Sequence, residues 1–306
     1  MMRTNTVTVV IPTYKPEEKF HNLMKMLQKQ TYPIARILLM NTERNYFPKG
    51  EYEHLPYVAV FHLTREEFNH GGTRDRAVSL CDSEYILFLT QDAQPVDEYL
   101  VEHLVAAFHD EKVAAAYARQ LPEKDCQIIE RYTREFNYPK ESSVKSRADL
   151  PVYGIKTFFC SNVCAMYRRK YYDELGGFEK HTIFNEDMIF AGKAIQAGFR
   201  IAYVAAAQVI HSHNYGNMEQ LRRNFDLAVS QADHPEIFSM AKSEHEGIKM
   251  VRQSAGYLWQ SGRPGQILNL IVKSGFKLIG YRLGKGYRKM PKWLILKLTM
   301  NKTYWN

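Results

Sequence analysis

Short apolar segments alternate with helix-like segments along the first two hundred residues, and this alternation restricts the possible folds more than any other feature of the sequence. Several of the apolar segments contain β-branched residues and are bounded by Pro, Asn or Gly, as buried parallel strands often are. The predicted strands are Val7–Ile11, Arg36–Met40, Tyr57–Leu63, Tyr85–Thr90 and Val113–Ala118. The predicted helices between them are Glu17–Gln30, Thr73–Cys81 and Val96–His109. This order predicts an α/β fold with a mostly parallel sheet flanked by helices.

The fourth predicted strand runs directly into Gln91 and Asp92 before Pro95 ends it. Ligands of open α/β sheets bind at the carboxyl ends of the strands, so a carboxylate at this place is a candidate site residue. Asp92 caps the helix predicted from Val96, binds a divalent cation such as Mg²⁺ or Mn²⁺, or is a solvated turn residue. These ions need few protein carboxylates when substrate phosphates complete their coordination. The residues alone leave these alternatives open.

A second candidate is the segment FNHGGTRDRA at residues 68–77. Gly71 and Gly72 allow a close approach to the backbone, and Arg74 lies in the first turn of the helix that follows. A helix N-terminus of this kind can bind an anion through its free N–H groups and its dipole. The alternative is a tight turn with a capped helix and no ligand. The segment is neither a GxGxxG nor a Walker motif.

Two later segments carry further polar candidates. Glu186 and Asp187 begin a predicted helix that ends at Ala197. Asp187 is either one of two charges that suit the start of a helix or a general base that deprotonates a hydroxyl group. His211 and His213 share one face of an extended segment and serve either as metal ligands or in packing.

Residues 216–246 have a polar helical pattern, which places two adjacent arginines, Arg222 and Arg223, on one helix. Adjacent guanidinium groups are well suited to neutralise a diphosphate. A further helix is predicted at Gln127–Phe136.

The positive charge of the chain is concentrated at its C-terminal end. Twelve of the 41 Lys and Arg residues follow Glu246, where no Asp or Glu occurs, and the preceding part carries 29 basic against 33 acidic residues. Apolar clusters alternate with these cations from about Gly265. The sequence shows no apolar run long enough to span a membrane and no signal peptide, and we expect its four cysteines to be reduced.

Eight segments in this order resemble the family 2 glycosyltransferases of the GT-A fold, and in particular bacterial rhamnosyltransferases. They are VVIPTYKP, LQKQTYP, EFNHGGTRDRA, YILFLTQDAQP, FFCSNVCAMYRR, YDELGGF, NEDMIFAGKAIQAGF and VIHSHNYGNMEQLRRNFD. The resemblance implies a Rossmann-like domain for nucleotide-diphospho-sugars at residues 1–245. Its nucleotide-sugar-binding half is 1–120 and its acceptor and catalytic half is 121–245. Residues 246–306 are expected to form a basic amphipathic helical extension.

The resemblance also assigns roles to individual residues. Asp187 is the expected catalytic base, and Asp92, His211 and His213 are the expected ligands of Mg²⁺ or Mn²⁺. The residues expected to bind the donor are Pro12, Thr13, Tyr14, Asn41, His70, Gly71, Gly72, Arg74, Gln91, Asp92, Arg222 and Arg223. Asn41 and Asp75 depart from the family pattern, in which the corresponding positions hold Asp and Asn.

The implied activity is the inverting transfer of L-rhamnose from dTDP-β-L-rhamnose to a hydroxyl group of a cell-surface glycan precursor, expected to be lipid-linked. Another donor, such as a UDP-hexose or a UDP-N-acetylhexosamine, is the alternative within the family. The basic extension is expected to hold a cytoplasmic enzyme at the inner face of the cell membrane, or else to pack on the catalytic domain or on a second subunit as a homodimer. Nucleic-acid binding through the extension is not expected, because it leaves the ordered motifs of residues 1–245 unexplained.

Overall fold

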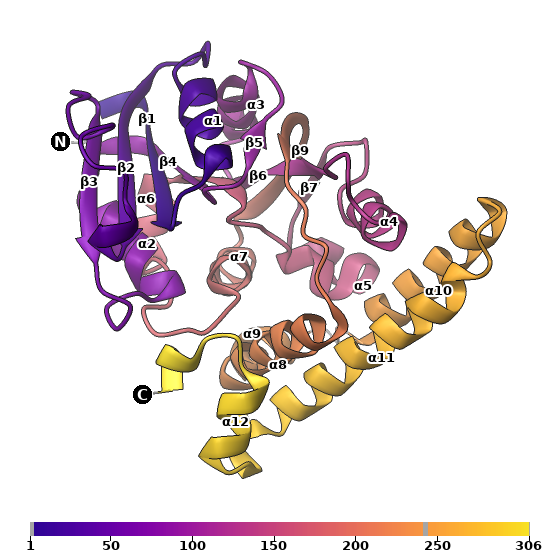
Figure 1. Cartoon of the computed structure of the whole chain (residues 1–306). Coiled ribbons are helices and arrows are strands. Elements are labelled where there is room, and N and C mark those ends of the chain that lie inside the picture. The colour runs from indigo at the N-terminus through magenta and orange to yellow at the C-terminus, as the bar shows by residue number, and fades with distance from the viewer. Residues whose placement is uncertain (1–2, 241–243, 306) are drawn as a thin grey trace.

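A mixed β-sheet forms the centre of the protein in a computed structural model that describes residues 3–240 and 244–305 (Figure 1). The strands run in the order β3-β2-β1-β4-β8-β6-β9-β5, and β7 also pairs with β9. Strands β1 to β4 and the pair β6–β9 are parallel, whereas β8 runs antiparallel to β4 and β6. The strands are β1 (Arg3–Tyr14), β2 (Ile34–Thr42), β3 (Val58–Leu63), β4 (Ser83–Leu89), β5 (Gln94–Pro95), β6 (Val113–Leu121), β7 (Ser143–Lys145), β8 (Cys164–Arg168) and β9 (Arg200–Ile210).

Helices cover both faces of this sheet. Successive strand residues point to opposite sides, so each buried strand presents apolar side chains to both layers of helices. In β1, Val9 and Ile11 pack against α1 and α3, whereas Val10 packs toward α2 and α7 on the other face. The helices are α1 (Glu18–Leu27), α2 (His70–Ser79), α3 (Leu100–Ala106), α4 (Ile128–Asn137), α5 (Leu150–Tyr153), α6 (Arg169–Glu174), α7 (Glu186–Gln196), α8 (Asn217–Asp233), α9 (Pro235–Phe238), α10 (Glu244–Gln260), α11 (Gln266–Lys285) and α12 (Lys292–Leu298). The predicted α/β architecture is thereby confirmed.

The region after β4 differs from the prediction. The chain makes a short strand, β5, and α3 begins only at Leu100 instead of Val96. Asp92 therefore lies in the turn between β4 and β5, eight positions ahead of that helix, and the interpretation of Asp92 as its cap is wrong. β8 and β9 were not among the strands predicted. In the structure, β9 pairs with β6 and extends the sheet.

The C-terminal residues form the predicted helical region and pack on α4 and α8. Helix α11 lies along α8 (Figure 1), and its Gly280 and Gly284 contact the α8 backbone. Helix α10 packs on α4, where Tyr257 stacks on Tyr132 with ring centroids 4.5 Å apart. The expected boundary between residues 245 and 246 falls inside α10, and residues 241–243 of the predicted helical stretch 216–246 lie outside the described part of the chain. Among the described residues, no helix is both long and apolar enough to cross a membrane.

The α8–α11 contact predicts opposite effects for two glycine substitutions in the same helix. A Cβ at Gly280 would lie 2.1 Å from the Leu221 carbonyl oxygen, so Gly280→Ala should lower the free energy of unfolding by about 1–3 kcal/mol. Gly275 has no atoms within 4 Å of such a Cβ, so Gly275→Ala should raise it by about 0.5–1 kcal/mol. Urea unfolding measures the free energy of unfolding of both variants. Equal stabilities of the two variants would contradict this packing.

Candidate active site

Two adjoining cavities lie at the carboxyl ends of the parallel strands. The central cavity has a volume of about 500 Å³ and contains Asp92, Asp187, His211 and His213 in its wall. The strand-end cavity, of about 660 Å³, is lined by the ends of β1 and β4 and by the C-terminal residues. The residues that line both cavities are His70, Thr90, Phe184 and Arg223. The two cavities therefore adjoin along these four residues.

One carboxylate and two imidazoles converge in the central cavity. Oδ2 of Asp92 lies 3.5 Å from Nε2 of His211 and 3.2 Å from Nε2 of His213, and a ligand atom of each residue lies within 4.8 Å of the other two. Burial alone would raise the pKa of Asp92, but hydrogen bonds with the two histidines outweigh it and hold the pKa far below its usual value. Asp92 is therefore ionised.

His211 is oriented by a residue behind it. Nδ1 of His211 lies 3.3 Å from Oε1 of Gln120, which also accepts a hydrogen bond from Arg134. If a cation takes the place of the hydrogen bond between His211 and Asp92, the oxygen at Nδ1 favours the tautomer with its proton on Nδ1 and leaves the lone pair of Nε2 for the cation. Burial lowers the pKa of His211, which favours the neutral imidazole that metals require.

This cluster has the donor atoms of a divalent-cation site. A carboxylate oxygen and two imidazole nitrogens suit a transition ion such as Mn²⁺ better than Mg²⁺, which prefers an all-oxygen shell. Gln120 contacts Nδ1 of His211 and is itself held by Arg134, and outer contacts of this kind orient metal-binding histidines in proteins. Asp92, His211 and His213 would hold the ion.

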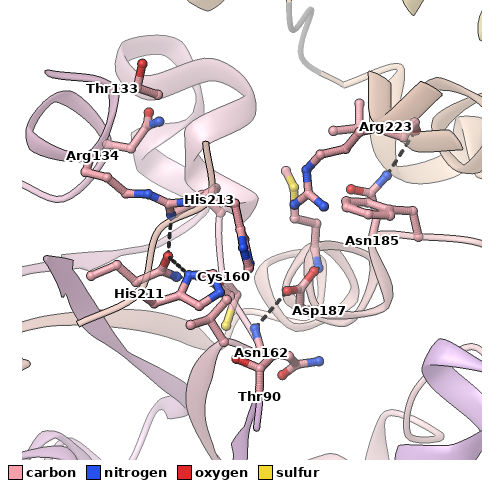
Figure 2. Close-up of a pocket in the computed structure, with 18 of the residues that line it drawn as sticks. Thr90, Thr133, Arg134, Cys160, Asn162, Asn185, Asp187, His211, His213 and Arg223 are labelled. Atoms are coloured by element: carbon pink, nitrogen blue, oxygen red, sulfur yellow. Dashed lines mark hydrogen bonds between the residues drawn. The ribbon is translucent and has the colours of Figure 1, made fainter. Parts of the chain in front are cut away.

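Asp187 lies on the other side of the central cavity, at the start of α7 (Figure 2). Asn185 precedes the helix in the left-handed conformation, with φ of 64°, and donates its side-chain amide to the Leu227 carbonyl. Oδ2 of Asp187 accepts a hydrogen bond from the Asn162 backbone N–H at 2.9 Å, and Oδ1 accepts one from the Met188 N–H at 2.7 Å. The carboxylate is held in one orientation by the chain itself.

The pKa of Asp187 is raised to about 7. Burial is the main cause and the neighbouring Glu186 carboxylate is the second, while the two backbone N–H donors oppose the shift. An acid with this pKa exchanges protons near neutral pH, as a general base must. Asp187, whose pKa is near neutrality, and the candidate cation ligands Asp92, His211 and His213, here called the Asp92 cluster, thus lie in the wall of one cavity.

Glu186 lies below this surface in a buried ion pair with Arg74. The guanidinium Nη1 lies 3.2 Å from Oε1 of Glu186, and the side-chain amide of Asn162 donates to the same oxygen at 3.1 Å. Burial alone would raise the pKa of Glu186, but the charge of Arg74, the neighbouring His70 and the hydrogen bond from Asn162 together outweigh it and keep the pKa low. Arg74 lines the central cavity as expected, but its guanidinium is shared with Glu186 and with the His70 carbonyl.

The glycines before Arg74 have a different role from the one expected. The side chain of Asn69 already accepts hydrogen bonds from the N–H groups of Gly71 and Gly72, so this helix end is capped. A Cβ at Gly71 would lie 1.8 Å from the Glu179 carbonyl oxygen, and one at Gly72 would lie 2.7 Å from that of Lys180. The close approach is made by the protein's own backbone, and the prediction of an anion at these N–H groups is wrong.

The strand-end cavity contains the residues expected near the nucleotide base. Pro12, Thr13 and Tyr14 line it at the end of β1. Gln91 lines it too, but its amide is engaged with the N–H and the carbonyl group of Tyr14, both at 2.9 Å. Asn41 does not line either cavity; it is fully buried and accepts a hydrogen bond from the Thr13 hydroxyl, so it supports the wall from behind.

The two arginines of α8 face different directions, because adjacent residues on a helix lie about 100° apart. Arg223 lines both cavities, with its guanidinium 4.7 Å from the Phe184 ring centroid. Arg222 is exposed and donates through Nε to the Lys297 carbonyl in α12. The expected arginine pair is therefore corrected to Arg223 alone. Asp75, the other departure from the family pattern, accepts a hydrogen bond from the Tyr172 hydroxyl away from both cavities.

Several residues of the site were missed by the sequence reasoning. Asn162 contacts both acids of α7, yet it lies in an irregular segment with no local pattern. Gln120 and Arg134 come from β6 and α4, and only the folded chain brings them to His211. Residues 300–303 line the strand-end cavity although they lie far from the motifs in sequence. The positive charge of the C-terminal region indicated membrane binding or packing, but it did not indicate that these residues line a cavity.

Comparisons with solved structures define the fold class. The mannosyltransferase PcManGT from Pyrobaculum calidifontis, solved in complex with GDP-Man and Mn²⁺, superposes with a TM-score of 0.60 at 14% identity, covering 93% of this chain and 88% of that one. The S. aureus TarS fragment 1–349, in complex with UDP-GlcNAc, gives a TM-score of 0.51 at 16% identity, with coverages of 93% and 92%. The fold is the GT-A fold of glycosyltransferases.

Sequence comparisons identify the family. The family model described as Glycosyl transferase family 2 matches residues 8–176. The chain is 37% identical over 302 residues to the O-antigen chain rhamnosyltransferase RfbN of Salmonella typhimurium (strain LT2), covering 98% of this chain and 96% of the relative. It is 35% identical to the O-antigen chain rhamnosyltransferase WbaN of Salmonella anatum, with coverages of 98% and 95%. The chain belongs to glycosyltransferase family 2, as its motifs predicted, and is a glycosyltransferase.

The Asp92 cluster predicts Mn²⁺ binding that depends on His213. The variant His213→Ala should weaken Mn²⁺ binding in the presence of a nucleoside diphosphate by about tenfold or more, because it removes one of three ligands. Electron paramagnetic resonance of free Mn²⁺ measures the affinity. His109→Ala removes an exposed histidine outside the cluster and should bind as the wild type does. Identical titrations for the two variants would exclude this cation site.

Proposed function

We propose that the protein transfers L-rhamnose from dTDP-β-L-rhamnose to a hydroxyl group of a lipid-linked glycan precursor, with inversion at the anomeric carbon. The two rhamnosyltransferase relatives support the sugar, since each aligns with nearly the whole chain. The observation that carries the mechanism is that Asp187 and the Asp92 cluster line one cavity. A base and a cation site in one cavity suit a single displacement between them.

Asp187 acts on the acceptor in this proposal. Its carboxylate takes the proton of the attacking hydroxyl, the acceptor oxygen forms a bond to the anomeric carbon, and the bond from that carbon to the donor phosphate breaks. The thymidine diphosphate leaves with the electron pair. The hydrogen bonds from Asn162 and Met188 fix the direction of attack, since they leave Asp187 no other orientation.

The leaving diphosphate gains negative charge, and the other residues of the site stabilise that charge. A divalent ion at Asp92, His211 and His213 supplies Lewis-acid stabilisation of that charge when it is bound. Arg223 lines both cavities and can pair with the diphosphate between them. Pro12, Thr13 and Tyr14 form the wall against which the nucleoside lies.

Other donor nucleotides are possible within the family. A UDP-hexose or UDP-N-acetylhexosamine would use the same base and cation. Thermal stabilisation by a panel of nucleotide sugars with Mn²⁺ separates these donors. We expect dTDP-β-L-rhamnose to give the largest shift, and a larger shift with a UDP-sugar would make the alternative correct.

Asp187→Asn should lower kcat by about 10²–10⁴-fold, because an amide cannot accept the hydroxyl proton. Its affinity for thymidine diphosphate should stay near that of the wild type. Since the pKa of Asp187 is about 7, activity of the wild type should fall on acidification below that pH as the base becomes protonated. Stopped assays across pH 5–9 give both results. Asp173→Asn, on the exposed side of α6, is the control, and full activity of Asp187→Asn would refute the role of the base.

We further propose that α11 places the enzyme on an anionic membrane at the cytoplasmic face. The face of α11 that points away from α8 exposes a set of apolar side chains: Leu268, Ile271, Val272, Leu278 and Ile279. Exposed Arg282 and Lys285 follow at the end of the same helix, so apolar and cationic groups adjoin. Lys277 of α11 lines the central cavity, which brings a lipid-linked acceptor near the base.

The membrane role predicts that Leu268→Ser/Leu278→Ser weakens binding to phosphatidylglycerol vesicles by about tenfold or more, because two exposed leucines no longer enter the lipid. Co-sedimentation measures the binding. Leu80→Ser, at an exposed leucine after α2, is the matched control. If the double variant and the control sediment alike, α11 is not the membrane-binding face.

A further inference from the structure

We propose that the C-terminal segment Thr299–Trp305, here called the C-terminal strap, forms one wall of the donor-nucleotide subsite and that Lys302 pairs with the diphosphate of the donor. This inference rests on the proposed function and goes beyond it, because it assigns donor binding to residues outside the matched family region, which ends at residue 176. The strap contributes Met300, Asn301, Lys302 and Thr303 to the wall of the strand-end cavity.

The strap is fixed at its start by a buried acid of α8. The Thr299 hydroxyl donates to Oδ1 of Asp226 at 2.7 Å, and the Met300 N–H donates to Oδ2 at 2.8 Å. Asp226 is 3% exposed and lies one helical turn after Arg223, which lines both cavities. Helix α8 therefore places an arginine in the site and holds the strap beside it.

The end of the strap is held by aromatic packing. The ring of Tyr304 stacks on His181 with centroids 4.6 Å apart, and Trp305 contacts Tyr287 edge-to-face at 5.4 Å. Within the strap, the Asn301 N–H donates to the Thr299 hydroxyl oxygen at 3.0 Å. Both ends are thus attached to the protein, and the exposed Lys302 between them borders the cavity.

The charges of the strand-end cavity match a nucleoside diphosphate. Arg65, Arg223 and Lys302 contribute cations from three separate parts of the chain. Among the described residues of its lining, Asp226 is the only acid, and its two oxygens accept the hydrogen bonds of the strap. A lysine on a flexible stem suits a phosphate as a mobile point charge.

The test compares thymidine diphosphate with thymidine as ligands of the full-length protein, by calorimetry in the presence of Mn²⁺. Lys302→Ala should weaken thymidine diphosphate binding by about tenfold and leave thymidine binding unchanged, because only the first ligand carries the phosphates. Lys297→Ala removes an exposed lysine of α12 that lines neither cavity, and it should bind both ligands as the wild type does. Since Lys302 is exposed, its loss should not unfold the chain.

A second variant, Thr299→Val, removes the hydroxyl bond to Asp226 and should weaken the binding of both ligands, since it loosens the whole wall. Unchanged thymidine diphosphate affinity in Lys302→Ala would overturn the inference while leaving the proposed function intact. If the wild type binds uridine diphosphate but not thymidine diphosphate, the proposed donor is wrong. The same loss in Lys302→Ala, measured with uridine diphosphate, would then still support the strap.

Discussion

The buried ion pair between Arg74 and Glu186 is the interaction on which the site depends. It joins α2 to α7, and it connects two motifs that lie more than a hundred residues apart in sequence. Removing one partner of such a pair typically costs about 3–5 kcal/mol, because the other charge stays buried without compensation. The pair also has a chemical effect, since the Glu186 carboxylate that Arg74 helps to keep ionised contributes to the raised pKa of Asp187. Burial is the main cause of that raised pKa, the Glu186 carboxylate adds to it, and the charge of Arg74 itself opposes it.

The sequence predicted the α/β sheet and the candidate acids because each signal was local. Val9, Val10 and Ile11 show a buried strand within a few residues, and Asp92 stands directly at the end of another. It failed where a role depends on distant contacts. The space at Gly71 and Gly72 is used by the backbone of Glu179 and Lys180, and nothing near the glycines in sequence indicates this. The direction of Arg222 could have been foreseen, since neighbours on a helix diverge, whereas the support that Asn162 gives Asp187 required the folded chain.

The C-terminal region contacts α8, exposes an apolar face and lines the strand-end cavity. Helix α11 packs closely on α8 through Gly280 and Gly284, and in the proposal its outer apolar face meets the membrane. The strap then returns to the strand-end cavity, where it faces the end of β1. The basic charge that sets this region apart in the sequence is therefore divided among several surfaces. Helix α10 spans the boundary expected between the catalytic domain and the extension.

The central claim is that an acceptor activated by Asp187 attacks the donor in one displacement, with the cation site holding the leaving group in the same cavity. The stereochemistry of the product tests this claim most directly. We predict that product made from dTDP-β-L-rhamnose is an α-L-rhamnoside, identified by the one-bond carbon–proton coupling at its anomeric centre in NMR spectra. A β-L-rhamnoside would require retention of configuration, and it would contradict the account.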